Sequence, residues 1–264
     1  MTSRHSPTIF SVTAAAGSEP LVGWASVVLV FLRSFLFLTG QVVTIVLYTP
    51  VVFAVYPLNP VTRSRIIAAW AHFIVWWLKF VCGLSHELTG AENIPRQPCV
   101  ILSKHQSAWE TIAFQTIFPP QAWVLKQELL RIPFFGWALA VSQPIAIDRR
   151  EGRKALQSVV KQGIDRLENG RFVVVFPEGT RMASGEKGRY NPGGAMLAVK
   201  ANSGVLPVAH NAGEFWPRRG FLKKPGVIRV VVGPMIGSEG KRAKQVSEEA
   251  GQWIEDAMAH LATR

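Results

Sequence analysis

The sequence predicts an α/β protein in which a mixed, largely parallel sheet is flanked by helices and preceded by N-terminal membrane-associated helices. From about residue 98 onward, short apolar runs alternate with longer amphipathic segments, as is typical of strands and helices around a sheet covered on both faces. The first 62 residues, in contrast, carry only three charges, on Arg4, Glu19 and Arg33. We therefore predict membrane-anchoring and interfacial helices over residues 1–85 and an α/β domain over residues 86–264.

The first apolar segment runs from Leu21 to Tyr56 and is interrupted by one charge, on Arg33. Its second part, Ser34–Tyr56, holds 23 uncharged residues, and about 20 apolar residues suffice for a helix to span a bilayer. Because Gly40 and Pro50 interrupt the pattern, a helical hairpin that dips into the membrane without crossing it is an equal alternative. The apolar part is too long for a cleavable signal peptide, which favours an anchor.

A second apolar segment, Ile66–Leu78, contains three tryptophans and is flanked by basic residues. Its 13 residues are too few to span a bilayer. Indole rings suit the headgroup boundary because they have one polar and one apolar side. We predict a helix at the membrane interface, with a helix buried in the protein core as the alternative.

In the α/β domain, strands are expected where short runs rich in valine and isoleucine are bounded by proline, glycine or asparagine. These runs are Cys99–Ser103, Ala122–Lys126, Ile145–Asp148, Phe172–Phe176, Val205–Ala209 and Val227–Val232. Helices are expected at Arg153–Leu167, from Ser107 to about Ile117, and at Val246–Leu261. The first of these is the clearest, because its apolar residues recur at helical spacing.

The chain is strongly basic, with a net charge of +12, of which residues 63–264 carry +11. Such a balance favours an anionic partner, such as a membrane surface or a phosphorylated molecule. Nucleic acid is not expected, because no binding module for it is recognisable and the apolar N-terminus would be left unexplained. The two cysteines, Cys82 and Cys99, lack metal-ligand spacing, so neither a metal site nor a disulfide framework is predicted.

The segment KHQSAWE, Lys104–Glu110, places a histidine and a carboxylate five residues apart. Inside one regular helix, His105 and Glu110 would point about 140° apart. The residues Ser107–Glu110 fit a capping box, however, which starts the helix at Ser107 and lets His105 fold back towards Glu110. The pair is therefore either a catalytic base with its orienting acid or a helix cap beside an ordinary loop histidine.

Three other predicted strand ends carry residues that suit a charged ligand. FPEGTR, residues 176–181, brings a carboxylate, a glycine, a hydroxyl and a guanidinium together in one turn, which favours an anion site. Arg149 and Lys126 follow two further runs. Ligands gather at the carboxyl ends of parallel strands, so we expect these side chains to converge, although Arg149 and Lys126 taken singly also fit ordinary surface residues.

Together these segments resemble the glycerolipid acyltransferases, most closely the 1-acyl-sn-glycerol-3-phosphate acyltransferases of bacterial phospholipid synthesis. The resemblance covers roughly residues 65–235 and rests on four ordered blocks: Lys104–Glu110, Pro144–Arg149, Phe176–Arg181 and Leu206–Ala209. The first block of the family is usually N-H-x-S-x-x-D. Here Lys104 replaces the asparagine and Glu110 replaces the aspartate, which keeps the charge and adds a methylene.

The resemblance implies a reaction and a substrate site. His105 would take the proton of the free hydroxyl of lysophosphatidic acid, whose oxygen attacks an acyl thioester, while Glu110 orients the imidazole. The phosphate would bind Arg149, Arg181 and Lys126. The acceptor pocket would be shaped by Glu178, Gly179 and Thr180.

The resemblance also implies partners and a location. The acyl donor is expected to be acyl-CoA or acyl carrier protein, with no cofactor and no metal. Membrane lipids are the other expected partners, and the bacterial inner membrane is the expected location, with the catalytic domain on the cytoplasmic face.

Several alternatives remain at this level. Another glycerolipid or lysophospholipid acyltransferase fits the same motifs, and so does a non-catalytic lipid-binding protein on the same fold. A serine-dependent hydrolase is disfavoured, because the chain has no G-x-S-x-G motif. The basic segment 218–226 is either a membrane-facing flank or a solvated loop. Four aromatic residues fit either an acyl-chain channel or the core: Trp123, Phe134, Phe135 and Trp137.

Overall fold

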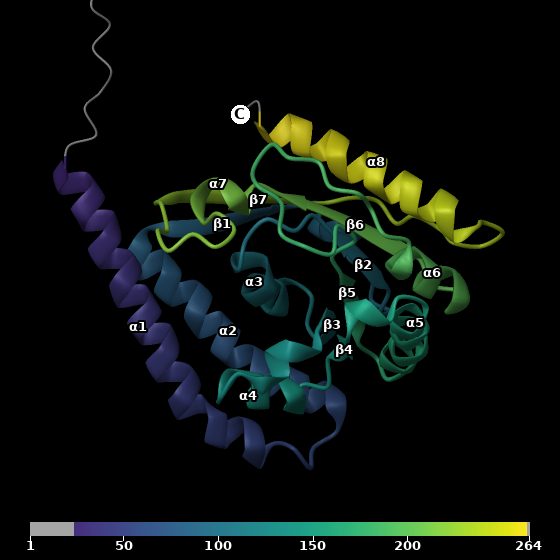
Figure 1. Cartoon of the computed structure of the whole chain (residues 1–264), viewed down its shortest axis with the longest axis horizontal. Helices are drawn as coiled ribbons and strands as arrows, with labels where there is room; N and C mark the ends of the chain where they lie inside the picture. The colour runs from purple at the N-terminus through teal and green to yellow at the C-terminus, as the bar shows by residue number, and fades with distance from the viewer. Residues whose placement is uncertain (1–23, 263–264) are drawn as a thin grey trace, which may run out of the picture.

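The computed structural model describes residues 24–262, and within that range a central sheet has seven strands in the order β1–β7–β6–β2–β5–β3–β4 (Figure 1). The strands are β1 (Leu84–Thr89), β2 (Val100–Ser103), β3 (Gln121–Lys126), β4 (Ile145–Ile147), β5 (Phe172–Val175), β6 (Val205–His210) and β7 (Gly226–Val232). All neighbouring pairs are parallel except β6–β7, which is antiparallel. The predicted mixed, largely parallel sheet is confirmed.

Helices cover both faces of the sheet (Figure 1). The helices are α1 (Trp24–Ala54), α2 (Pro60–Cys82), α3 (Trp109–Ile117), α4 (Phe135–Val141), α5 (Arg153–Glu168), α6 (Gly193–Lys200), α7 (Ala212–Phe215) and α8 (Ala243–Ala262). Three short 3-10 helices are η1 (Ala91–Asn93), η2 (Gln127–Arg131) and η3 (Arg149–Glu151). Because side chains alternate along a strand, Ile101 of β2 packs with Ile74 and Phe114 on the α2–α3 face, whereas Leu102 packs with Leu197 on the α6–α8 face.

All six predicted strands are present, and one strand was not predicted. β1 has the sequence LSHELT, in which polar residues outnumber apolar ones. Leu84 is buried, and the strand lies at the edge of the sheet, where it pairs with β7. An edge strand needs only a short apolar face, so its composition carries little signal. The predicted division of the chain between residues 85 and 86 falls inside β1.

The second N-terminal helix, α2, is longer than the predicted segment Ile66–Leu78. The Oδ1 atom of Asn59 caps its first turn by accepting from the Thr62 N–H (2.9 Å), with Pro60 next, and Gly83 ends it at φ 65°. The helix has 23 residues where 13 were predicted, and by length and composition alone it is long and apolar enough to cross a membrane. The basic residues taken as flanks lie inside the helix.

One face of α2 is buried and the opposite face is exposed, so the alternative of a helix buried in the protein core is confirmed for one face, and the membrane interface stays a prediction for the other. Ala71, Ile74 and Leu78 are buried in the core beside the sheet. Trp76 and Phe80, in contrast, are exposed, and their rings stack on each other with centroids 5.5 Å apart. The helix therefore joins the α/β domain to an exposed aromatic surface.

The first helix, α1, has 31 residues and lies beside α2 (Figure 1). Neither Gly40 nor Pro50 breaks it. At Gly40 the helices approach so closely that an added Cβ would lie 2.4 Å from Nε1 of Trp77. Most large apolar side chains of α1 are exposed, and the helix is long and apolar enough to cross a membrane. Together, α1 and α2 indicate membrane association, while residues 21–23 of the predicted apolar segment lie outside the described residues.

The basic segment 218–226 packs against α1. Its Lys223 is buried, the Lys223 N–H donates to Oγ of Ser34 (2.9 Å), and its ammonium lies over the rings of Phe37 and Trp216. Phe221 contacts the ring of Phe31 of the same helix. The segment is therefore attached to the candidate membrane helix and is not a freely solvated loop.

Candidate active site

The loop between β2 and α3, called the β2–α3 loop below, is fixed through its backbone. The Lys104 carbonyl accepts a hydrogen bond from Nε2 of His210 (2.9 Å). The His105 N–H donates to Oε2 of Glu178 (2.9 Å), and the His105 carbonyl accepts from the Met182 N–H (2.7 Å). Groups that follow or end three neighbouring parallel strands, β2, β5 and β6, therefore hold the histidine in place.

Glu110 lies in the first turn of α3 and is fully buried. Its Oε1 atom accepts from Nδ1 of His105 (2.8 Å) and from the N–H groups of Gln106 (2.9 Å) and Ser107 (2.7 Å). Burial alone raises the pKa of Glu110, but the electrostatic interaction with the neighbouring His210 ring and the hydrogen bonds that the carboxylate accepts outweigh burial and hold the pKa below its ordinary value. The carboxylate is therefore ionised at neutral pH and held in place.

The structure contains both arrangements that the spacing of His105 and Glu110 allowed. Glu110 accepts from the Ser107 N–H, as in a capping box, whereas Oγ of Ser107 accepts from the Trp109 N–H (3.1 Å) and not from that of Glu110. The helix itself begins at Trp109, two residues later than predicted. One carboxylate thus caps the helix and orients the histidine.

The hydrogen bond to Glu110 assigns a tautomer to the neutral His105 ring. Because a carboxylate only accepts, Nδ1 carries the proton and Nε2 keeps a free lone pair. The ring stacks on Phe176, with centroids 4.0 Å apart and planes inclined by 15°. The side chain of His105 is 14% exposed, so a fixed imidazole reaches the surface of the site with a basic nitrogen available.

His210 holds the β2–α3 loop through a hydrogen bond to its backbone. It is fully buried at the end of β6, and burial lowers its pKa, so the ring is neutral. Its Nδ1 accepts from the Ala212 N–H (3.3 Å), which leaves the proton on Nε2 for the Lys104 carbonyl. Sequence reasoning missed this residue, although it follows an apolar run and ends a strand, as the predicted site residues do.

The segment 176–181 forms a turn after β5. The Gly179 N–H donates to the Phe176 carbonyl (3.0 Å), and Gly179 has φ 69°, a conformation that favours glycine. Thr180 is exposed at the tip of this turn. Both residues therefore lie where the turn meets the surface, beside the ring that stacks on His105.

Glu178 of the same turn points inward, and its side chain is fully buried. One oxygen, Oε1, lies 2.7 Å from Nζ of Lys104, and the other accepts from the His105 N–H. Burial raises the pKa of Glu178, although the Lys104 ammonium and the His105 N–H oppose the shift. With both oxygens bound inside the protein, Glu178 can shape the site through the loop that it holds.

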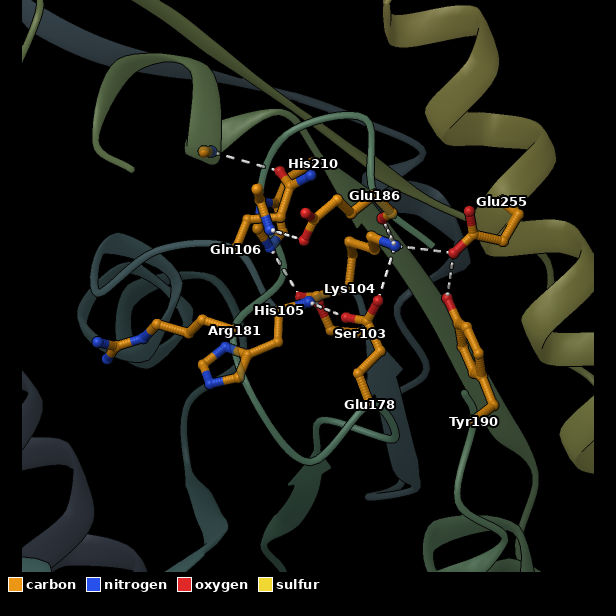
Figure 2. Close-up of polar contacts among 12 residues, drawn as sticks. Ser103, Lys104, His105, Gln106, Glu178, Arg181, Glu186, Tyr190, His210 and Glu255 are labelled. Carbon is orange, nitrogen blue, oxygen red and sulfur yellow. Dashed lines mark hydrogen bonds and ion pairs between the residues drawn. The ribbon is translucent and has the colours of Figure 1, made fainter. Parts of the chain in front are cut away.

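Arg181 is the best-placed candidate for binding an anion. Its carbonyl accepts from Nη1 of Arg218 (3.0 Å), but across residues 24–262 no carboxylate pairs with its guanidinium, and its Nε is buried without a hydrogen-bond partner. Figure 2 shows the side chains of Arg181 and His105 directed away from the buried polar cluster around Lys104. A partly buried guanidinium with an unused donor suits a phosphate group.

The other two predicted phosphate ligands lie at the same edge of the sheet. Lys126 is exposed at the end of β3, paired in register with Ile147 of β4. Arg149 begins η3 directly after β4, and its side chain lies outside the described residues. Because β2, β5, β3 and β4 are parallel neighbours, their carboxyl ends place both residues on the side of the sheet that carries His105.

A cavity of about 320 Å³ adjoins this site. Its mainly apolar lining comes from β3, β4, β5, α5 and the start of α6, and includes Phe176, Pro177 and Gly179 of the turn. Four aromatic residues considered for an acyl-chain channel lie elsewhere. Trp123 belongs to the core on the α2–α3 face, and the exposed residues around α4 are Phe134, Phe135 and Trp137.

The fold and the site together define a class: an α/β enzyme with a carboxylate-oriented histidine beside an arginine whose guanidinium has no carboxylate partner within residues 24–262. Comparisons agree, since the family model described as Acyltransferase matches residues 85–211. Over 216 residues the chain is 46% identical to the 1-acyl-sn-glycerol-3-phosphate acyltransferase of Pseudomonas aeruginosa, covering 80% of this chain and 84% of that protein. The chain therefore belongs to the 1-acyl-sn-glycerol-3-phosphate acyltransferase family.

Two further comparisons agree with this assignment. The chain is 31% identical over 160 residues to the enzyme of the same name from Borreliella burgdorferi, which covers 60% of this chain and 64% of that protein. The crystal structure of the 1-acyl-sn-glycerophosphate acyltransferase from Thermotoga maritima matches with a TM-score of 0.72, over 90% of this chain and 96% of that one. At 22% identity, this last match concerns the fold.

Proposed function

We propose that the protein transfers a fatty acyl group from an acyl thioester to the sn-2 hydroxyl of 1-acyl-sn-glycerol-3-phosphate, which gives phosphatidic acid. The observation that carries this proposal is the hydrogen bond of 2.8 Å between His105 and Glu110, next to an arginine without a carboxylate partner within residues 24–262. The 46% identity to a bacterial enzyme of that name supports the choice of substrate.

In the proposed reaction, Nε2 of His105 takes the proton of the hydroxyl as its oxygen attacks the thioester carbonyl. Glu110 keeps the proton on Nδ1 and stabilises the imidazolium that forms. The tetrahedral intermediate then collapses, the carbon–sulfur bond breaks, and the departing thiolate receives the proton from Nε2. The substrate supplies the nucleophilic oxygen, so neither a serine nor a cysteine of the protein is acylated, and the chemistry requires no cofactor.

Arg181 binds the phosphate of the acceptor through the donors that the protein leaves unused. A guanidinium can present two parallel N–H groups to a phosphate, which fixes its orientation as well as its charge. Lys126 and Arg149 add positive charge at the same edge of the sheet. The apolar cavity beside Phe176 offers a site for an acyl chain, with a volume typical of small-molecule pockets.

The acceptor and the product are lipids, whereas acyl-CoA and acyl carrier protein, the two candidate donors, are water-soluble and anionic. An enzyme anchored by α1 and α2 with a basic body meets both kinds of substrate at the membrane surface. We place the catalytic domain on the cytoplasmic face of a bacterial inner membrane, the location that the family resemblance implies.

An acceptor screen with the purified protein in detergent micelles tests the proposal. Lysophosphatidic acid should be acylated in preference to glycerol 3-phosphate, lysophosphatidylcholine and lysophosphatidylethanolamine, with acyl-CoA and acyl carrier protein compared as donors. The His105→Ala variant should lose on the order of 10²- to 10⁴-fold in kcat, as expected when a general base is removed. Preference for another acceptor would move the protein to a different acyltransferase activity, and wild-type turnover by His105→Ala would exclude the proposed base.

A further inference from the structure

Lys104 is a buried lysine at the centre of a polar cluster beneath the β2–α3 loop (Figure 2). Its side chain is 1% exposed, and Nζ lies 2.7 Å from Oε1 of Glu178, 2.8 Å from Oε1 of Glu255 and 3.0 Å from the Glu186 carbonyl. Nζ donates hydrogen bonds to Glu255 and to the Glu186 carbonyl, and its contact with Glu178 is an ion pair. A charge buried in this way requires such partners.

The contact with Glu178 connects Lys104 to the histidine of the candidate site. Glu178 binds the ammonium through Oε1 and the His105 N–H through Oε2. A single carboxylate therefore lies between the Lys104 ammonium and the backbone of His105. Because the ammonium fixes this carboxylate and opposes the rise in its pKa, it also fixes the N–H from which the imidazole extends.

The contact with Glu255 connects Lys104 to α8, 151 positions away in the chain. The hydroxyl of Tyr190 donates to the same oxygen, Oε1 of Glu255 (3.0 Å). Burial first, and then the negative charges of Glu255 and Glu178, raise the pKa of Tyr190, so its hydroxyl stays protonated and remains a donor. The helix packs on β6 through apolar residues, and Glu255 adds the polar link from this helix to the loop.

We propose that Lys104 is a positioning residue that ties α8 and the turn after β5 to the β2–α3 loop and thereby holds His105 in its working position. One ammonium pairs with the buried carboxylate of Glu178 and the partly buried carboxylate of Glu255, so its removal leaves two like charges without the cation between them. Like charges held this close oppose each other's ionisation, and the buried Glu178 then takes up a proton at higher pH. A protonated Glu178 holds the His105 N–H less well, and the histidine loses its fixed geometry.

This inference rests on the acyl-transfer function proposed above, and the turnover of the wild-type protein tests that function separately. The first test is Lys104→Met, which keeps the length of the side chain and removes the charge. We expect kcat to fall at least 10-fold, the KM for lysophosphatidic acid to change less than 3-fold, and the acid limb of the kcat–pH profile to move to higher pH. These three readouts separate loss of positioning from loss of substrate binding.

The double variant Lys104→Met/Glu255→Gln tests the charge argument. It removes one of the two carboxylates that paired with the ammonium, so we expect kcat to recover at least 3-fold over Lys104→Met and the acid limb to move back. Lys241→Met is the matched control, because its Nζ pairs with Glu249 of the same helix (2.6 Å) in an exposed position away from the loop. It should keep wild-type kcat and pH dependence.

If Lys104→Met does not fold, two variants that disturb the cluster less test the positioning role of Lys104. Glu255→Gln and Tyr190→Phe keep the lysine, and Glu255 is only partly buried, at 14% side-chain exposure. Each should lower kcat about 3- to 10-fold at unchanged acceptor KM, in line with the loss of one charge-assisted hydrogen bond. Wild-type kcat in both, wild-type kcat in a folded Lys104→Met protein, or a loss seen only in KM would overturn the proposal.

Discussion

At the scale of single residues, the site depends on one oxygen atom. Oε1 of Glu110 accepts from the imidazole of His105 and from two backbone N–H groups. The two backbone hydrogen bonds hold the carboxylate in place without substrate, so the acceptor of the imidazole is oriented in advance. This arrangement explains how a glutamate, one methylene longer than aspartate, serves in this position: its length is absorbed by the loop that folds back over it.

Glu110→Gln should therefore lower turnover while leaving the fold in place. The amide oxygen can still accept from the backbone, but no charge remains to stabilise the imidazolium, and the amide N–H favours the wrong tautomer. We expect kcat to fall on the order of 10³- to 10⁴-fold, as when the orienting carboxylate of a catalytic triad is neutralised. Steady-state kinetics with lysophosphatidic acid would measure it, with Glu249→Gln, exposed on α8, as the control. Unchanged kcat would show that Glu110 acts only as a helix cap.

The stability of the protein should also depend on the ionisation of Glu110. Its folded-state pKa lies below the ordinary value of 4.5, so the ionised form stabilises the fold fully above that value, and the contribution is lost as pH falls through the lowered pKa. The difference in free energy of unfolding between wild type and Glu110→Gln should stay constant from neutral pH to 4.5 and shrink below it. Denaturant unfolding at several pH values measures this difference, and a difference that grew on acidification would contradict the assignment.

Arg181→Ala should raise the KM for the acceptor and leave the KM for the acyl donor unchanged. A charge-assisted hydrogen bond contributes about 1.5–3 kcal/mol, so the KM for lysophosphatidic acid should rise about 10- to 100-fold. Arg189→Ala is the matched control, an exposed arginine eight positions along the chain. Monoacylglycerol, which lacks the phosphate, should be used equally by the variant and the wild type. An unchanged acceptor KM in Arg181→Ala would exclude the arginine from phosphate binding.

At the scale of the elements, the close approach of α1 and α2 gives a further prediction. Gly40→Leu inserts a side chain where even a Cβ would lie 2.4 Å from Nε1 of Trp77, so the helices must separate. We expect a loss of about 1–3 kcal/mol in unfolding free energy, as for other overpacked sites. Thermal unfolding in detergent micelles measures it, and Val43→Leu, at an exposed position of α1, should leave the midpoint unchanged. An equal midpoint in both variants would show that the helices do not pack this closely.

Gly40 also shows why the sequence predicted some elements better than others. From the sequence, Gly40 was interpreted as an interruption of an apolar run. In the structure it is the position of α1 at which α2 packs closely. The strands β2 to β7 were found because short runs of branched residues have local boundaries. The ends of α2, at Asn59 and Gly83, were missed because Arg63 and Lys79 were taken as flanks.

In the candidate site, too, contacts between residues close in the sequence were predicted, and contacts between distant segments were not. His105 and Glu110 were paired from their spacing, because both belong to one loop and one helix turn. The contacts of Lys104 with Glu178 and Glu255 join segments that are far apart in the chain, and nothing local marks them. A glutamate on an amphipathic helix such as α8 looks like any solvated residue until the fold brings a buried lysine beside it.

At the scale of the whole molecule, two kinds of surface suit contact with a membrane. The exposed aromatic face of α2 includes Trp76, which is 54% exposed, and Phe80, which is 71% exposed, and α1 lies beside it. The basic body carries most of the net charge of +12. Added salt does not weaken apolar burial, whereas attraction to anionic lipids weakens as ionic strength rises. The two contributions can therefore be separated by experiment.

Sedimentation with vesicles should show both contributions. Vesicles of phosphatidylethanolamine and phosphatidylglycerol should bind the protein more tightly than phosphatidylcholine vesicles at low salt, and the difference should shrink at high salt. Phe80→Glu should weaken binding to both kinds about 10-fold or more, because burying such a ring contributes about 1.5–3 kcal/mol. Lys244→Glu, a larger charge change on the exposed face of α8, should weaken only the binding to anionic vesicles. If Phe80→Glu bound phosphatidylcholine vesicles as the wild type does, the aromatic face of α2 would not be in contact with the membrane.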